Sequence, residues 1–281
     1  MNTLTLLKKR IAVLLISFIM TLGALAEDHD HGHIYEGASA YYLAEHGDFE
    51  IGYEDGELEM HIHLHAGTIV DGNVLEEDTS FAPEQLVVVA TETAEILRPD
   101  GSDWQPTGVD VNETLWVLPQ HEKEGLPALG FSTHDIDTGL FVEDQIQLRL
   151  RALQGPGDFS LWEDNALGQP IFYISSYAGQ TSAVFPIGLH AHHNWGFSAP
   201  GDYILVFEAT ADLVTGGSAE ALSIYRFKVT DVPLRLQPLP GDVNGDGHVD
   251  EHDLHIVEDN LGETAPTWPA NSNLAMEQTH H

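Results

Sequence analysis

Hydrophobic and polar residues alternate along several short stretches of this chain. Over residues 58–64, apolar residues occupy every even position and polar residues stand between them. Residues 146–151 and 203–209 show the same period, and 223–229 is a further strand candidate. A period of two places successive side chains on opposite faces of a β-strand. Residues 86–90 are apolar without alternation, which indicates a strand buried on both faces.

Turn signals separate these stretches, as at residues 155–157 and 200–201, where glycine and proline are adjacent. No stretch before residue 250 has the apolar period of a helix longer than two turns, and the sequence shows no internal repeat. Many short strands joined by turns predict a mainly β fold. We expect an antiparallel β-sandwich domain over residues 34–231.

The first 26 residues have the three parts of a secretory signal peptide. A basic segment at 8–10 precedes an apolar run at 11–25, and Ala24 and Ala26 form an A-x-A-like cleavage site. The apolar run is short for a membrane anchor, which is the alternative. We therefore expect cleavage near Ala26, a secreted or cell-surface location, and no membrane span in the mature chain.

Charge and composition narrow the possible partners. The chain has 45 acidic and 10 basic residues, a formal net charge of −35. Residues 1–26 carry three positive charges and no negative charge, so their removal changes −35 to −38. Such a chain repels nucleic acid and anionic lipid but attracts cations. Cysteine is absent, which excludes disulfides, thiolate metal sites and cysteine catalysis.

Besides the signal peptide, four short segments lie outside the predicted β domain. Residues 27–33 (Glu-Asp-His-Asp-His-Gly-His) form a His/Asp-rich tail. Residues 232–240 contain three prolines and predict a stiff linker. A compact acidic motif follows at 241–262, and residues 263–281 form a C-terminal tail without clear periodicity.

Residues 242–253 have the ligand spacing of an EF-hand-like calcium loop. A hard cation needs six or seven oxygen ligands at about 2.4 Å, and this spacing arranges them around one point. Gly247 stands where the loop must turn sharply, and Val249 is the apolar residue that packs inward. The predicted Ca²⁺ ligands are Asp242, Asn244, Asp246, His248 (through its backbone carbonyl), Asp250 and Asp253.

The calcium motif differs from a complete EF-hand. Pro238 and Pro240 block an entering helix, whereas a helix can follow over 251–261. The loop-then-helix unit at 241–262 resembles a type I dockerin repeat. This resemblance implies calcium-dependent folding and docking onto a cohesin-like protein. Dockerins normally carry two such repeats and residues 263–281 contain no second loop, so another cell-surface component is the alternative partner.

Two segments carry histidine at alternate positions. Three imidazoles within 61–65 share one strand face, and His190 and His192 repeat the arrangement, while His193 points the other way. Imidazoles at i and i+2 can bind one ion, but the outer two of the three are about 13 Å apart along a strand.

Two histidines from each segment can therefore complete one site. The predicted zinc or copper ligands are His61, His63, His190 and His192. A polar sheet face without metal is the alternative. We interpret His46, His121 and His134, which are isolated in the sequence, as structural residues.

The β region also resembles a known family. The motifs that carry the resemblance are 47–53 (GDFEIGY), 116–120 (WVLPQ), 129–131 (LGF), 147–162 (QLRLRALQGPGDFSLW) and 189–203 (LHAHHNWGFSAPGDY). They are similar to the choice-of-anchor M domain of actinobacterial-type surface-anchored proteins. The resemblance implies export and attachment to a cell surface. It also implies a metal-linked role, because some members are similar to proteins encoded beside metal-type ABC transporters.

No catalytic motif stands out in the chain. H-E-x-x-H, G-x-S-x-G and a phosphate loop are all missing from the sequence. We therefore expect a non-catalytic binding protein rather than an enzyme. A metal-dependent hydrolase built on the four histidines, a purely structural surface module and a carbohydrate-binding module remain alternatives. The tryptophans that could stack on sugars are Trp104, Trp116, Trp162 and Trp195.

Overall fold

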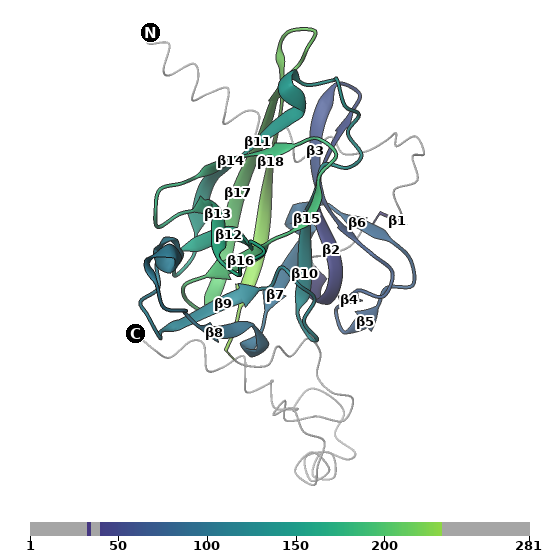
Figure 1. Cartoon of the computed structure of the whole chain (residues 1–281). Coiled ribbons are helices and arrows are strands. Elements are labelled where there is room, and N and C mark those ends of the chain that lie inside the picture. The colour runs from purple at the N-terminus through teal and green to yellow at the C-terminus, as the bar shows by residue number, and fades with distance from the viewer. Residues whose placement is uncertain (1–32, 35–39, 232–281) are drawn as a thin grey trace, which may run out of the picture. The chain divides into compact units, whose positions relative to one another are not determined.

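Two β-sheets make up the part of the chain that the computed structural model describes, residues 33–34 and 40–231 (Figure 1). The larger sheet contains β1 (His33–Ile34), β2 (Ala40–Glu54), β3 (Glu57–Leu64), β4 (Ile69–Val70), β5 (Asn73–Val74), β6 (Thr79–Phe81), β7 (Leu86–Ala90), β10 (Pro127–Ser132), β11 (Gln145–Gln154), β14 (Ser182–Pro186), β15 (His190–His192), β17 (Gly201–Asp212) and β18 (Ser218–Val229). The smaller sheet contains β8 (Glu95–Leu97), β9 (Thr114–Leu118), β12 (Phe159–Asp164), β13 (Pro170–Ser175) and β16 (Asn194–Phe197).

Helical structure within the described residues is limited to short 3₁₀ turns. They are η1 (Pro83–Gln85), η2 (Glu92–Ala94), η3 (Ser102–Thr107) and η4 (Val142–Asp144). No helix among these residues is long and apolar enough to cross a membrane. The predicted signal peptide, linker, calcium repeat and C-terminal tail lie outside the described residues, as does the predicted N-terminal tail apart from its last residue.

The strands predicted from alternation are confirmed. Residues 58–64 lie in β3, where the four apolar side chains are buried and the polar ones are more exposed. Residues 146–151 lie in β11, and 203–209 and 223–229 lie in β17 and β18. The apolar run at 86–90 is β7, which is almost entirely buried.

The fold is mainly β, as expected, but the larger sheet is mixed and not antiparallel throughout. Its strand order is β1-β6-β3-β2-β7-β18-β17-β11-β14, with β10 paired to β2 and β15. β7 pairs in parallel with both β2 and β18, and β10 pairs in parallel with β2. Parallel strands are typically buried on both faces, which agrees with the continuous apolar sequence of β7.

The two sheets pack against each other through aromatic side chains. Phe49 of β2 lies 5.8 Å from Trp195 of β16, measured between ring centroids, and 4.2 Å from Tyr225 of β18. All three residues are fully buried. Burying each such side chain stabilises the fold by about 1.5–3 kcal/mol. One face of β2, β3 and β10 packs on this core, and their other face is left for polar side chains.

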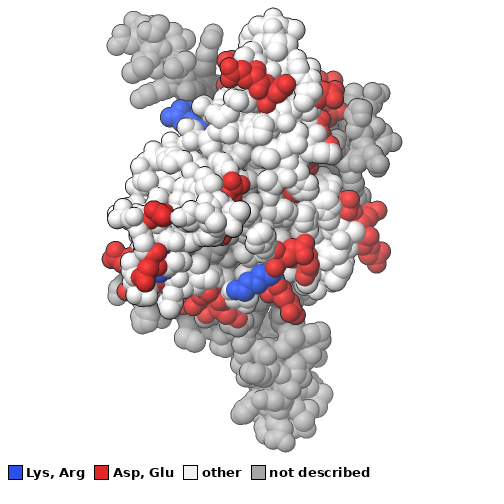
Figure 2. All heavy atoms as spheres, in the orientation of Figure 1, with Lys and Arg blue, Asp and Glu red and all other residues white. Residues whose placement is uncertain are grey.

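Acidic side chains dominate the charged surface. Figure 2 shows them in several separate areas of the face in view, with few lysine or arginine side chains among them. This distribution agrees with the strongly negative charge of the sequence and favours cations over anions near the surface.

Candidate metal centre

Four strands bring polar side chains together on the face of the larger sheet that lies away from the aromatic core. β15, β10, β2 and β3 follow one another in this order and lie side by side (Figure 1). In one cross-strand row, Asp48 of β2 lies between His63 of β3 and Gly130 of β10. Gly130 in turn pairs with His192 of β15. Neighbouring strands are about 4.8 Å apart, so side chains in such a row can meet.

Small residues on β10 make room for these side chains. β10 carries Ala128, Gly130 and Ser132 at alternate positions, with Leu129 and Phe131 between them in the core. A Cβ at Gly130 would collide with Oδ1 of Asp48 and would lie 3.4 Å from Nε2 of His192. The missing side chain therefore lets a carboxylate from β2 and an imidazole from β15 approach each other above β10.

His46, Asp48, His190 and His192 form the first histidine group. Each offers one ligand atom within 4.8 Å of the others. Asp48 accepts hydrogen bonds from Nε2 of His190 (3.0 Å, through Oδ1) and from Nε2 of His46 (3.3 Å, through Oδ2). The side chain of Asp48 is 6% exposed, whereas that of His190 is 46% exposed, so the group opens to solvent at its β15 side.

The electrostatics of the first histidine group suit a cation. Burial raises the pKa of Asp48, but the hydrogen bond from His46 and the charges of His190 and His46 outweigh it and lower that pKa to about 2. Burial lowers the pKa of His192, and the neighbouring His46 adds to this effect. The hydrogen bond to Asp48 raises the pKa of His46 against the effect of burial. At neutral pH the group thus contains a buried carboxylate and a neutral imidazole. A metal ion would displace the imidazole protons that are hydrogen-bonded to Asp48.

His63, His65 and Asp78 form a second histidine group beside the first. Their ligand atoms also lie within 4.8 Å of one another. His65 connects the groups, because its Nε2 lies 3.2 Å from Oδ2 of Asp48. Burial lowers the pKa of His63, which keeps this imidazole in the neutral form that binds metal.

The four predicted ligands do not form one site. β2 and β10 separate β3 from β15, which puts three strand spacings, about 14 Å, between their backbones. His190 and His192 belong to the first group and His63 to the second. His61 faces another carboxylate, with its Nε2 3.0 Å from Oε2 of Glu50. The prediction of one ion held by all four histidines is therefore wrong.

His46, interpreted from its isolation in the sequence as a structural residue, lies in the first group. Its signal in the sequence is the alternation of His46, Asp48 and Glu50, which places three polar side chains on one face of β2. His193 does point the other way, as predicted. It is buried beside the ring of Tyr173, and burial lowers its pKa to about 4. His121 and His134 are exposed and belong to neither group.

A hollow of about 260 Å³ adjoins the first group. It is lined by Glu45, Glu122, Lys123, Glu124, Leu126 and Ala128. Oε1 of Glu122 lies 4.0 Å from Nδ1 of His46. Three carboxylates against one lysine make this hollow a favourable approach for a cation.

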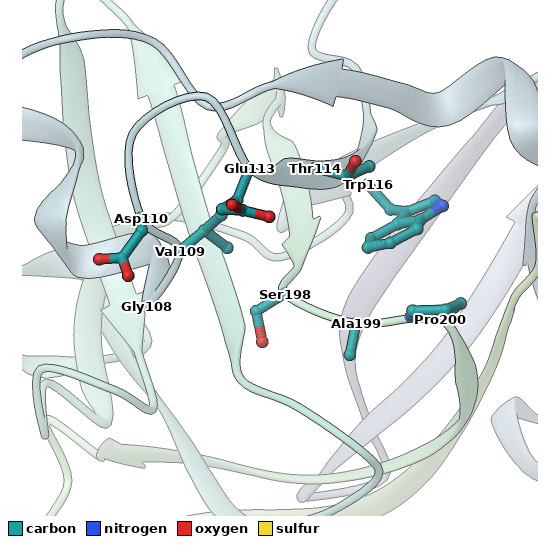
Figure 3. Close-up of a pocket in the computed structure, with 9 residues that line it drawn as sticks. All are labelled: Gly108, Val109, Asp110, Glu113, Thr114, Trp116, Ser198, Ala199 and Pro200. Atoms are coloured by element: carbon teal, nitrogen blue, oxygen red, sulfur yellow. The ribbon is translucent and has the colours of Figure 1, made fainter.

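A second hollow, of about 380 Å³, is lined by no residue of either group. Figure 3 shows Trp116 near Pro200 at one end of it and Asp110 at the other. Trp116 is only 8% exposed, and Trp162 and Trp195 are fully buried. These three tryptophans therefore belong to the packed interior and offer little ring surface for stacking on a sugar.

Comparison with models of protein families and with curated proteins found no match for this chain. The resemblances to the choice-of-anchor M domain and to the dockerin repeat stay predictions. The candidate metal centre is accordingly interpreted from its own geometry.

Proposed function

We propose that this protein is an exported, non-catalytic metal-binding protein whose β domain holds a zinc or copper ion in the first histidine group. The observation that carries the proposal is the convergence of three imidazoles and one buried carboxylate within 4.8 Å. Nitrogen and oxygen ligands of this kind bind Zn²⁺ at about 2.0–2.2 Å, and imidazole also suits copper. The hydrophobic core against β2 and the pairing of β15 with β10 fix the positions of the strands that carry the ligands.

The number of ligands favours binding over catalysis. Three histidines and Asp48 offer the four ligands of a closed tetrahedral site, whereas catalytic zinc sites keep one position open for water or substrate. A metal-dependent hydrolase is therefore the weaker candidate. The burial of three tryptophans likewise weakens the carbohydrate-binding alternative.

The test is zinc titration of the full chain, made without a histidine tag and with calcium present to fill the C-terminal loop. His190→Ala with His192→Ala should weaken the tightest zinc site by more than about 100-fold, because two of its four ligands are lost. His134→Ala is the matched control, since this exposed histidine lies outside both groups. Unchanged zinc affinity in the double variant would exclude the proposal.

The proposal includes a calcium-binding C-terminal unit that attaches the protein to a cohesin-like or other cell-surface partner. Its support is the filled ligand pattern over residues 242–253. Asp242→Ala with Asp246→Ala should abolish calcium binding, because two anionic ligands are lost together. Calorimetry of calcium binding checks this, and equal affinity in the variant and the unmodified chain would refute the assignment. The zinc affinity should be the same in both, since the histidine groups lie on other residues.

A further inference from the structure

The second histidine group has the spacing of a metal site of its own. Oδ2 of Asp78 lies 3.8 Å from Nε2 of His63 and 3.7 Å from Nδ1 of His65. These distances are too long for hydrogen bonds. They are close to the separation of about 3.3 Å between ligand atoms of a tetrahedral ion with bonds near 2.0–2.1 Å. The carboxylate and the two imidazoles therefore lie at the spacing of metal ligands and not of hydrogen-bonded partners.

Hydrogen bonds hold the other polar atom of two of these ligands. Nδ1 of His63 lies 3.1 Å from Oγ of Ser80, and Oδ1 of Asp78 accepts a hydrogen bond of 2.8 Å from the backbone N–H of Ala66. Partners of this kind fix the orientation of metal ligands and are a regular part of metal sites.

The third ligand, His65, is held by the first group. Its Nε2 donates to Oδ2 of Asp48 at 3.2 Å, which leaves Nδ1 directed at Asp78. The same carboxylate accepts from His190 through Oδ1. Asp48 can therefore bind an ion in the first group through one oxygen and orient a ligand of the second group through the other.

We propose that His63, His65 and Asp78 bind a second divalent transition-metal ion, and that Asp48 couples the two sites. This inference rests on the proposed function, because the coupling requires an ion in the first group. The second ion has three protein ligands, and the side chain of Asp78 is 49% exposed, so water completes its shell. It binds more weakly than the first ion and exchanges faster.

Counting zinc ions per full-length chain tests the second site. The count is made by competition with a chromophoric chelator, in calcium, on chains without a tag. The histidines near both ends of the chain are unchanged in every variant, so only differences between variants are interpreted. His63→Ala with Asp78→Asn should bind one zinc ion fewer than the unmodified chain and should keep the tightest site. His134→Ala should lose none.

Two outcomes separate this inference from the proposed function. If the His63/Asp78 variant keeps the full count while the His190/His192 double variant loses one ion, the second site is wrong and the first stands. If the His190/His192 variant loses no ion, the proposed function itself is wrong. Asp78→Asn alone, which preserves an oxygen for the bond from Ala66, serves if the double variant fails to fold. It should weaken the second ion by about 10-fold or more, and an unchanged second ion overturns the inference.

Discussion

The two His-x-His segments of this protein have the same pattern and different surroundings. β15 directs both His190 and His192 into the first group. β3 directs His61 to Glu50 and His63 to the second group, and His65, which follows the end of the strand, belongs to that group as well. The alternation places imidazoles on one face of each strand, but the neighbouring strand decides which ligands they meet. Beside β15 that neighbour is β10, whose small side chains leave space, and beside β3 it is β2, which presents carboxylates.

The largest effect should come from Asp48, where the two segments meet. Asp48→Asn keeps the shape of the side chain and removes its charge. We expect the zinc affinity of the first site to fall by more than about 100-fold and that of the second by about 10- to 100-fold. Asp110→Asn is the control, since it removes the same charge from an exposed residue of neither group. Zinc titration measures both variants, and equal affinities would show that Asp48 is not shared.

Closing the space above β10 should weaken the first histidine group more than the second. Gly130→Ala puts a methyl group against Asp48, which should cost about 1–3 kcal/mol of stability and about 10- to 100-fold in first-site zinc affinity. Gly52→Ala is the matched control, because a Cβ there meets nothing within 4 Å. Denaturant unfolding and zinc titration measure these effects. Unchanged first-site zinc affinity in Gly130→Ala would contradict the proposal that β10 leaves space for the ligands.

The pair formed by Glu50 and His61 should affect stability without affecting metal binding. Burial raises the pKa of Glu50, but the hydrogen bond and charge of His61 outweigh it and lower the pKa to about 2. A lowered pKa stabilises the fold above the unfolded value of about 4.3, and this contribution disappears as the pH falls toward 2.

Glu50→Gln should therefore cost about 1–3 kcal/mol at pH 7. The difference from the unmodified chain should shrink as the pH falls from about 4.3 to 2. Urea unfolding at a series of pH values, in the presence of a chelator, measures it. A cost that is independent of pH would contradict the pairing, and a loss of zinc binding would place Glu50 in a metal site.

The strands could be predicted from the sequence because burial of one face imposes a period of two, as in β3. The mixed topology could not, since the pairing of β2 with β7 and β10 joins residues far apart in the chain. The partners of the histidines depend on this order. Alternation correctly placed His190 and His192 on one face of their strand. The distance of His61 and His63 from them follows only from the strand order, in which β2 and β10 lie between β3 and β15.

Two features of the sequence nevertheless indicate the strands that form the first histidine group. Polar residues alternate over 46–50, on the strand that supplies His46 and Asp48. Residues 128–132 alternate small with large, which marks a strand with one open face. Neither signal identifies a metal site alone, because both are common in strands with one solvated face.

The central claim is that the first histidine group binds a transition-metal ion, and anomalous diffraction at the zinc absorption edge tests it most directly. Crystals of the full chain grown with zinc should show an anomalous peak about 2.0–2.2 Å from the side-chain ligand atoms of His46, Asp48, His190 and His192. A weaker peak beside His63, His65 and Asp78 would add the second ion. Zinc peaks elsewhere in the chain, with none at the first group, would contradict the account.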